Sequence, residues 1–146
     1  IRRNWTDERA ANLDLVLTAA EEAREELRDY IDAGASVPGR WGPIGGDFHQ
    51  SSVYFSEVNE PTFFNFDLCG PGWRAYDIAA FLSNANLMHA PAERSEAFFA
   101  GYYAVRPLSE EDHAAISPFL TIRRVWLMGA FAREDGLVGH TFVGSI

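Results

Sequence analysis

The chain has 146 residues and a mass of 16.3 kDa, which is enough for one domain with its own hydrophobic core. Hydrophobic residues make up 47% of the sequence and aromatic residues 14%, so the composition excludes a disordered segment. The net charge of -9 argues against a protein that binds the phosphate backbone of nucleic acid, because that function needs a basic face.

The sequence also disfavours a membrane protein and a zinc-binding protein. No apolar stretch is long enough to cross a bilayer and the start has no signal-peptide pattern, so we expect no membrane partner. Cys69 is the single cysteine, and the four scattered histidines give no zinc-binding spacing. A reducing, cytoplasmic setting fits best. The first residue is Ile1 rather than methionine, so we expect either a piece of a longer protein or a trimmed form.

The first part of the chain predicts helices. Thr6–Leu17 has helical composition, and Thr18–Glu21 has the pattern of a capping box, in which a hydroxyl and a carboxylate bind free N–H groups at a helix start. The next helix is expected to stop at Gly34, because glycine favours the conformation that follows a helix end. That helix is expected to place five apolar residues on one face: Ala20, Ala23, Leu27, Tyr30 and Ile31.

The middle of the chain changes to strand and loop patterns. Pro38–Pro43 contains two prolines and two glycines, which interrupt any helix. Ser52–Ser56 and Thr62–Asp67 are rich in valine, tyrosine and phenylalanine and predict two strands. Glu57–Pro61 is expected to be the loop of this short antiparallel hairpin, and Cys69–Gly72 a second loop that ends the second strand.

After the hairpin the pattern is helical almost to the end. Apolar residues recur at intervals of three and four in Ala75–Met88, Ala92–Val105 and Ser109–Glu134. The sequence therefore predicts one domain over residues 1–146, of the α+β class and mainly helical. Within it, residues 1–35 form a helical part and residues 36–74 a loop and hairpin region. Residues 75–135 form a second helical part, and residues 136–146 a tail without clear pattern.

Two helix starts are indicated within the last helical stretch. Ser109–Asp112 resembles a capping box. Ser117 is followed by Pro118, which is typical of an N-cap and the first helical position. We therefore expect two helices in this stretch. The side chains of Arg123 and Arg124, which lie late in it, are expected to be solvated or paired.

Three segments carry the residues that indicate a chemistry. Gly45–Ser52 enters the first strand, Phe64–Asp67 closes the second, and Gly70–Ala79 opens the next helix. In order and spacing they resemble the aminoglycoside phosphotransferase and choline kinase superfamily, which has a protein-kinase-like fold. That family has a catalytic loop His-Gly-Asp-x-His-x-x-Asn, a metal-binding segment Asp-Phe-Asp, and then a Gly-Pro turn and a Tyr-Asp-Leu-Ala helix start. The matching residues here are Gly46, Asp47, His49, Phe66, Asp67, Gly70, Pro71, Tyr76, Asp77 and Ala79.

The resemblance implies a kinase-like C-terminal lobe and ATP-dependent transfer of phosphate to a small hydroxylated molecule. Magnesium and ATP would be the cofactors, and a nucleotide and a small-molecule acceptor the partners. Asp47 would be the catalytic residue, which accepts a proton from the attacking hydroxyl or orients it. The other expected site residues are the magnesium ligands Ser52, Asn65 and Asp67 and the loop-supporting residues His49 and Asp77.

Three positions depart from the family pattern. The leading histidine is Gly45, the asparagine is Ser52, and the first metal-binding aspartate is Asn65. A neutral hydroxyl or amide oxygen binds magnesium less well than a carboxylate does. Asp67 would lie on the same face as Asn65 in a regular strand and could supply the missing charge. The segment that would form the nucleotide-binding N-terminal lobe is not in this chain, so a lobe outside it is an expected partner.

Three functions stay open. The first is a working phosphotransferase whose other lobe lies outside the chain. The second is a catalytically inactive kinase-like domain that binds or scaffolds. The third is a generic helical domain with a chance match, which the order of the motifs disfavours. The kinase interpretation further predicts that Asp47 and Asn65 lie near each other, and that an apolar patch is exposed where the other lobe would dock.

Overall fold

The computed structural model describes residues 2–132, which form five α-helices, two 3-10 turns and two small antiparallel sheets. This confirms the expected mainly helical α+β class. The helices are α1 (Arg2–Glu26), α2 (Arg28–Ala33), α3 (Arg74–Leu87), α4 (Ala92–Val105) and α5 (Glu110–Ala132). The strands are β1 (Trp41–Ile44), β2 (Val53–Phe55), β3 (Pro61–Phe63) and β4 (Gly70–Trp73).

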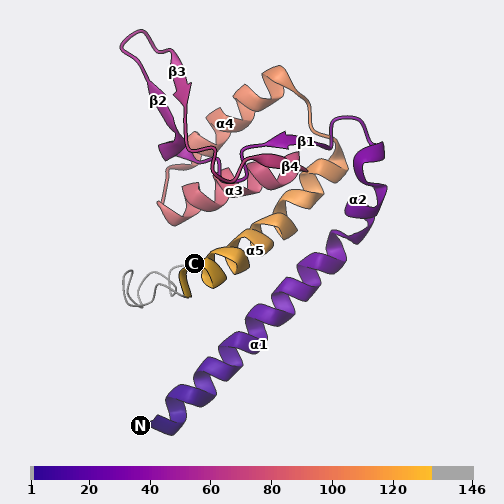
Figure 1. Ribbon diagram of the computed structural model, residues 1–146, viewed down its shortest axis with the longest axis vertical. Helices are drawn as coiled ribbons and strands as arrows, with labels where there is room; N and C mark the ends of the chain where they lie inside the picture. The colour runs from indigo at the N-terminus through magenta and orange to yellow at the C-terminus, as the bar shows by residue number, and fades with distance from the viewer. Residues whose placement is uncertain (1, 133–146) are drawn as a thin grey trace.

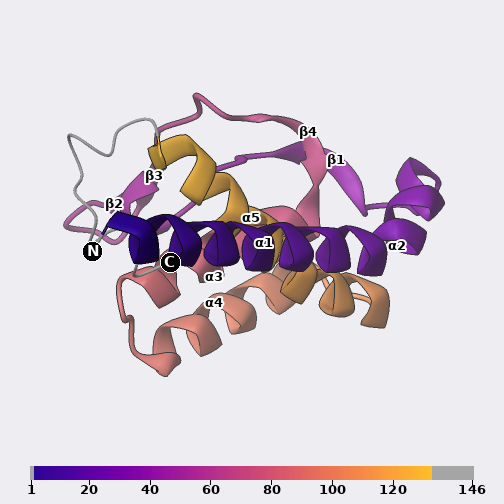
Figure 2. The same ribbon diagram turned by 90° about the horizontal axis from the view of Figure 1, so that it is seen from below.

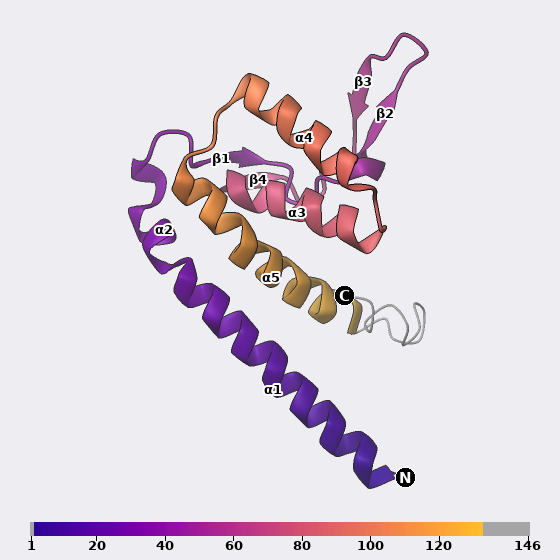
Figure 3. The same cartoon turned by 180° about the vertical axis from the view of Figure 1, so that it is seen from behind.

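The helices form a layered lobe from which a hairpin projects. Helix α5 packs between α1 and α3, and the hairpin β2–β3 extends away from the helices (Figures 1 and 3). Seen from below, α1 lies in front of α5, with α4 on one side and the strands on the other (Figure 2). Within the described residues, no helix is long and apolar enough to cross a membrane.

The hydrophobic core lies where the end of α1, helix α2, helix α3 and the first half of α5 meet. Its largest fully buried side chain is Ile78, which is 1% exposed. Alanines at the start of α3 let the neighbouring helices approach closely, because they add little side-chain volume. The buried cluster consists of Leu27, Tyr30, Ala75, Ile78, Ala79, Ala115, Ile116 and Phe119. Of the face predicted for the second helix, Ala23, Leu27 and Tyr30 are buried, whereas Ile31 is 39% exposed.

The predicted helix start at Thr18–Glu21 is wrong. Helix α1 runs without interruption from Arg2 to Glu26, and the break comes at Leu27. The residues around Thr18 are mostly good helix formers, so a capping pattern among them does not end the helix. The stop at Gly34 is confirmed, since α2 ends at Ala33 and Gly34 has a φ of 55°.

The predicted second helix start at Ser117 is also wrong. Helix α5 continues through Pro118. A proline inside a helix removes one backbone hydrogen bond and costs about 3 kcal/mol. The neighbours Ile116 and Phe119 are buried in the core, and their packing offsets that cost. The end of the predicted helical stretch and the whole predicted tail lie outside the described residues.

The capping box at Ser109 is confirmed. The N–H of Asp112 donates to Ser109 Oγ at 3.1 Å, and the N–H of Ser109 donates to Asp112 Oδ2 at 3.3 Å.

The predicted hairpin is present but shorter than expected. Val53 pairs with Phe63 and Phe55 with Pro61. Ser52 belongs to a 3-10 turn, Gln50–Ser52, and residues 64–67 lie outside the strand.

The prediction of a single hairpin missed a second sheet. Strands β1 and β4 pair antiparallel, with Trp41 opposite Trp73 and Ile44 opposite Gly70. Both strands are rich in glycine and proline, which hides their strand character in the sequence. The side chain of Ile44 fills the space beside Gly72, because a Cβ on Gly72 would lie 2.3 Å from Ile44 Cδ1.

Candidate active site

The loop that follows β1 is held by a carboxylate at the start of α3. The N–H of Gly45 donates to Asp77 Oδ2 at 2.7 Å, and the N–H of Gly46 donates to Asp77 Oδ1 at 2.8 Å. Pairing of β1 with β4 brings the loop to this helix, because α3 follows β4 directly. Hydrogen bonds to a charged acceptor are among the stronger ones in proteins. The backbone just before Asp47 is therefore firmly positioned.

The structure brings the first two motif segments together at the backbone. Gly46 has a φ of 73°, and a Cβ there would lie 2.2 Å from the carbonyl oxygen of Leu68. The N–H of Phe64 donates to the carbonyl of Ser52 at 3.1 Å. The loop before the hairpin and the segment after it thus touch at two places.

Asp47 is paired with a buried arginine. Its Oδ1 accepts a hydrogen bond from Arg123 Nη2, and the side chain of Asp47 remains 25% exposed. Arg123 is 5% exposed, lies over the ring of Trp126 at 4.6 Å, and has Nη1 3.4 Å from the hydroxyl of Tyr76. The sequence prediction of a solvated or paired Arg123 did not anticipate its burial or its partner. One feature of the sequence does indicate its burial. Arg123 lies four residues after Phe119 and three before Trp126, so on a helix it shares a face with these large apolar side chains.

The three expected magnesium ligands differ sharply in exposure. Ser52 is 1% exposed, and its Oγ has no hydrogen-bond partner among the described residues. Asn65 and Asp67 are exposed. Asn65 has a φ of 65° and lies outside any strand, so the regular alternation that would put Asp67 on its face does not hold.

These residues do not fit a magnesium ion as they stand. Magnesium requires near-octahedral oxygen ligands and prefers charged ones. The set offers the exposed carboxylate of Asp67, the exposed amide of Asn65 and the buried hydroxyl of Ser52. Across residues 2–132, no three His, Cys, Asp or Glu side chains gather where they could hold a metal.

His49 lies in the turn that leads into the hairpin. Its Nδ1 accepts a hydrogen bond from the N–H of Ser51 at 3.2 Å, which caps the 3-10 turn. The preceding residue, Phe48, contacts Phe63 and Phe81, with ring centroids 5.8 and 6.3 Å away. The loop is thereby joined both to the hairpin and to α3.

Large apolar side chains are exposed around the hairpin. Tyr54 is 63% exposed and Phe55 57%, although neighbouring residues of a strand point to opposite faces. Neither face of β2 is therefore fully covered by the described chain. Other exposed residues of the hairpin and the segment after it are Val58, Phe63, Phe64, Phe66 and Leu68.

Known proteins match this chain over most of its length. The model of the phosphotransferase enzyme family matches residues 1–119. An uncharacterized protein of Deinococcus radiodurans is 36% identical over 133 residues, which cover 88% of this chain and 39% of that protein. An uncharacterized protein of Synechocystis sp. is 31% identical over 112 residues, which cover 70% of this chain and 31% of that protein.

A solved structure shares the fold. It is amicoumacin kinase hAmiN in complex with AMP-PNP, Ca2+ and Ami. The match has a TM-score of 0.65 and 23% sequence identity, and it covers 87% of this chain and 41% of that one. The chain therefore spans less than half the length of each of these three proteins.

Proposed function

Since the chain belongs to the phosphotransferase enzyme family, we propose that it is the helical lobe of an ATP-dependent kinase of a small hydroxylated molecule, with substituted metal-binding positions. The observation that supports this most is the pair of hydrogen bonds from Gly45 and Gly46 to Asp77. They fix the loop that carries Asp47. Phosphoryl transfer depends on positioning and charge neutralisation more than on covalent chemistry of the protein.

Asp47 is the residue proposed to orient the acceptor hydroxyl. A carboxylate that accepts a proton, or directs a hydroxyl, must be reachable by the substrate. The side chain of Asp47 is 25% exposed, so one side of it is open to solvent. The net charge of -9 favours an acceptor that also carries a positive charge, through general attraction.

A second candidate function, a catalytically inactive binding or scaffold domain, is supported by the pairing of Asp47 with Arg123. The guanidinium neutralises the charge of the proposed catalytic carboxylate. The neutral residues Ser52 and Asn65 point in the same direction, because they weaken binding of the metal that such transfer uses. In this alternative the lobe keeps its fold and its small-molecule or protein contacts but transfers no phosphate.

The test uses the full-length protein that contains this lobe. Transfer of labelled γ-phosphate from ATP to a panel of small hydroxylated amines is measured for the unaltered protein and for Asp47→Asn. We expect Asp47→Asn to lower the rate by about a hundredfold or more, as loss of a proton-accepting group does. Asp32→Asn is the matched control, because Asp32 is exposed on α2, and it should leave the rate unchanged.

Two results would separate the candidates. Equal transfer by the unaltered protein and Asp47→Asn would refute the role of Asp47. Nucleotide binding without transfer to any acceptor, in both proteins, would favour the inactive domain.

A further inference from the structure

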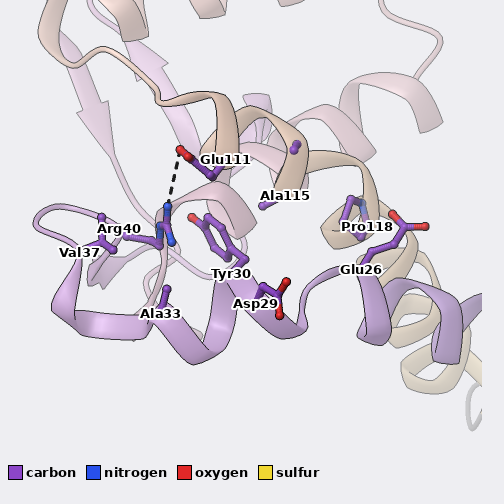
Figure 4. A pocket seen from close by; sticks show the side chains of 10 residues that line it. Glu26, Asp29, Tyr30, Ala33, Val37, Arg40, Glu111, Ala115 and Pro118 are labelled. Carbon is purple, nitrogen blue, oxygen red and sulfur yellow. Dashed lines mark ion pairs between the residues drawn. The ribbon is translucent and has the colours of Figure 1, made fainter.

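One pocket of the lobe holds an arginine whose charge is already matched. Figure 4 shows it between α2 and the first half of α5, with Arg40 beside Glu111. Arg40 Nη2 lies 3.9 Å from Glu111 Oε2, and Arg40 Nε lies 3.6 Å from Asp112 Oδ1. Glu26 and Asp29 line the same pocket. Because carboxylates outnumber the guanidinium, this pocket has no positive charge left for an anion.

A second pocket has the opposite balance of charge. It has a volume of about 400 Å³ and lies between the end of α4, strand β1 and the start of α3. Small-molecule sites have volumes of this order. Its lining consists of Pro43, Arg74, Asp77, Tyr102, Val105 and Arg106. Neither Asp47 nor any expected magnesium ligand belongs to it, so the pocket is distinct from the place proposed for phosphate transfer.

Two guanidinium groups meet at one glycine in this second pocket. Arg74 Nη1 donates to the carbonyl of Gly39 and, at 3.0 Å, to that of Trp41. A Cβ on Gly39 would lie 2.8 Å from Arg106 Cζ, so the second guanidinium lies against the same residue. Among the described residues, no carboxylate lies within 4.0 Å of a nitrogen of either arginine. Two like charges repel each other, and an anion beside both would replace that repulsion by attraction.

The hydroxyl of Tyr102 adds a third donor. It has no hydrogen-bond partner among the described residues, and its ring is held against Phe98 with centroids 6.0 Å apart. Burial raises the pKa of this hydroxyl, while the nearby charges of Arg106 and Arg74 act against that rise. The hydroxyl therefore stays protonated near neutral pH and lies close enough to both guanidiniums to sense their charge.

These donors are within reach of a ligand. Arg74, Tyr102 and Arg106 are all partly exposed. Arg40 Nε and Arg123 Nε are unpaired and shut off from solvent, but no nitrogen of Arg74 or Arg106 and no oxygen of Tyr102 is in that condition. The unpaired donors of the second pocket therefore have surface that a ligand oxygen can contact.

The charge of the lining selects a monoanion. Its one acidic residue is Asp77, whose oxygens already accept the N–H groups of Gly45 and Gly46. The lining thus carries two positive charges and one negative charge. A ligand with one negative charge neutralises it, whereas a dianion would add excess negative charge to a chain of net charge -9. A planar carboxylate also matches the donor geometry of a guanidinium.

We propose that this pocket binds a small organic carboxylate of single negative charge. The carboxylate oxygens accept hydrogen bonds from Arg106, Arg74 and the Tyr102 hydroxyl. A compact apolar body lies against Pro43 and Val105. Because neither Asp47 nor the metal-binding positions take part, this site stands independently of the proposed function.

Binding is tested by titrating the ¹⁵N-labelled 146-residue chain with benzoate at constant ionic strength, followed by NMR. Shifts should be concentrated around Gly39, Arg74 and Arg106. Benzamide has the same shape without the charge and should bind at least about tenfold more weakly, because it loses the charge-assisted hydrogen bonds. Phenyl phosphate keeps the ring but carries close to two negative charges near neutral pH, and it should also bind more weakly than benzoate.

Three variants assign the binding to these side chains. Arg106→Gln should weaken benzoate binding about tenfold, and Tyr102→Phe about threefold, because one loses a charged donor and the other a neutral one. Arg124→Gln is the matched control, since Arg124 is exposed on α5 outside the lining, and it should leave the affinity unchanged.

The melting temperature without ligand separates binding from a structural role. Arg106→Gln should leave it unchanged or raise it, because the repulsion from Arg74 is removed. If Arg106→Gln does not fold, the three ligands test the same contact on the unaltered chain.

Several results would overturn the proposal. They are no saturable binding of benzoate at millimolar concentration, equal affinity for benzoate and benzamide, and tighter binding of phenyl phosphate than of benzoate. Equal effects of Arg106→Gln and Arg124→Gln would overturn it too, as would shifts that centre on Arg40 or on the loop around Asp47.

Discussion

Asn65 is one of the three expected magnesium ligands, and a change to aspartate there adds a charge without adding bulk. Asn65→Asp would place a second carboxylate close in sequence to Asp67. We expect magnesium to raise the melting temperature of this variant by a few degrees and to leave the unaltered chain nearly unchanged, because a tenfold excess over Kd stabilises by about 1.4 kcal/mol. Without metal the variant should be slightly less stable, since two carboxylates then repel each other.

A matched control exists for this variant. Asn59 is also exposed and has a φ of 60°, so Asn59→Asp adds the same charge at a residue with a similar φ. It should show no magnesium-dependent shift. A shift of equal size in both variants, or already in the unaltered chain, would contradict the assignment of Asn65. Restoring Ser52→Asn at the same time is not advisable, because Ser52 is 1% exposed and a larger side chain would overpack its site.

At the residue scale, motif spacing located some partners and missed others. Asp77 could be assigned to the loop because both belong to one ordered pattern in the sequence, and the structure joins them by two hydrogen bonds. Arg123 could not be assigned to Asp47, because 76 residues separate them and their contact depends on how α5 packs. The burial of Ser52 likewise depends on tertiary packing, which no short pattern records.

The first turn of α5 offers a test at the scale of a single element. Ser109→Ala removes the Oγ that accepts from the N–H of Asp112, and we expect it to lower the free energy of unfolding by about 1 kcal/mol. Ser117→Ala should be neutral or slightly stabilising, because Ser117 is exposed inside a continuous helix and alanine is the better helix former.

Urea denaturation of both variants is the measurement. A similar loss for the two serines would mean that Ser117 also caps a helix, as its position before Pro118 first indicated, and that α5 is divided.

The elements that the sequence predicted well are those with a strong local signal. The hairpin around Asn59 has aromatic strands and a clear turn, and α3 and α4 have regular apolar spacing. Strands β1 and β4 escaped prediction because Gly42 faces Gly72 and Pro43 faces Pro71. Such residues disfavour strands on their own, and only their mutual pairing makes the sheet.

For the molecule as a whole, Tyr30 links stability to alkaline pH. Burial raises the pKa of its hydroxyl, and the hydrogen bond to Asp112 raises it further. Burial also raises the pKa of Tyr102. A tyrosine of the unfolded chain ionises near pH 10, whereas these two folded tyrosines ionise only at higher pH. Their contribution to the free energy of unfolding is therefore fully present below about pH 10 and is lost as the pH rises beyond it.

The size of this loss is measurable. Each such tyrosine lowers the free energy of unfolding by up to about 1.4 kcal/mol per pH unit above 10. The sequence contains no lysine, whose side chain would titrate in the same range. Urea midpoints between pH 9 and 11 should fall less steeply for Tyr30→Phe than for the unaltered chain, although the variant starts about 1 kcal/mol less stable. Tyr54→Phe, at a 63% exposed position, should keep the original slope. Parallel slopes for Tyr30→Phe and the unaltered chain would show that Tyr30 does not control this decline.

The exposed aromatic residues of the hairpin predict that another part of a longer protein covers them. Tyr54 and Phe55 expose more than half of their surface on opposite faces of β2, and the relatives are more than twice as long as the part that matches. If another lobe docks there, Tyr54→Ser and Phe55→Ser should change the unfolding free energy of this chain by less than about 0.5 kcal/mol. In the full-length protein each should destabilise by about 1 to 3 kcal/mol, because the same apolar surface is then buried.

Val105→Ser, at an 89% exposed position on α4, controls for the general effect of adding a serine. Equal, small effects of the hairpin variants in both proteins would mean that the hairpin stays uncovered, and that its aromatic residues face solvent or a small molecule rather than a second lobe.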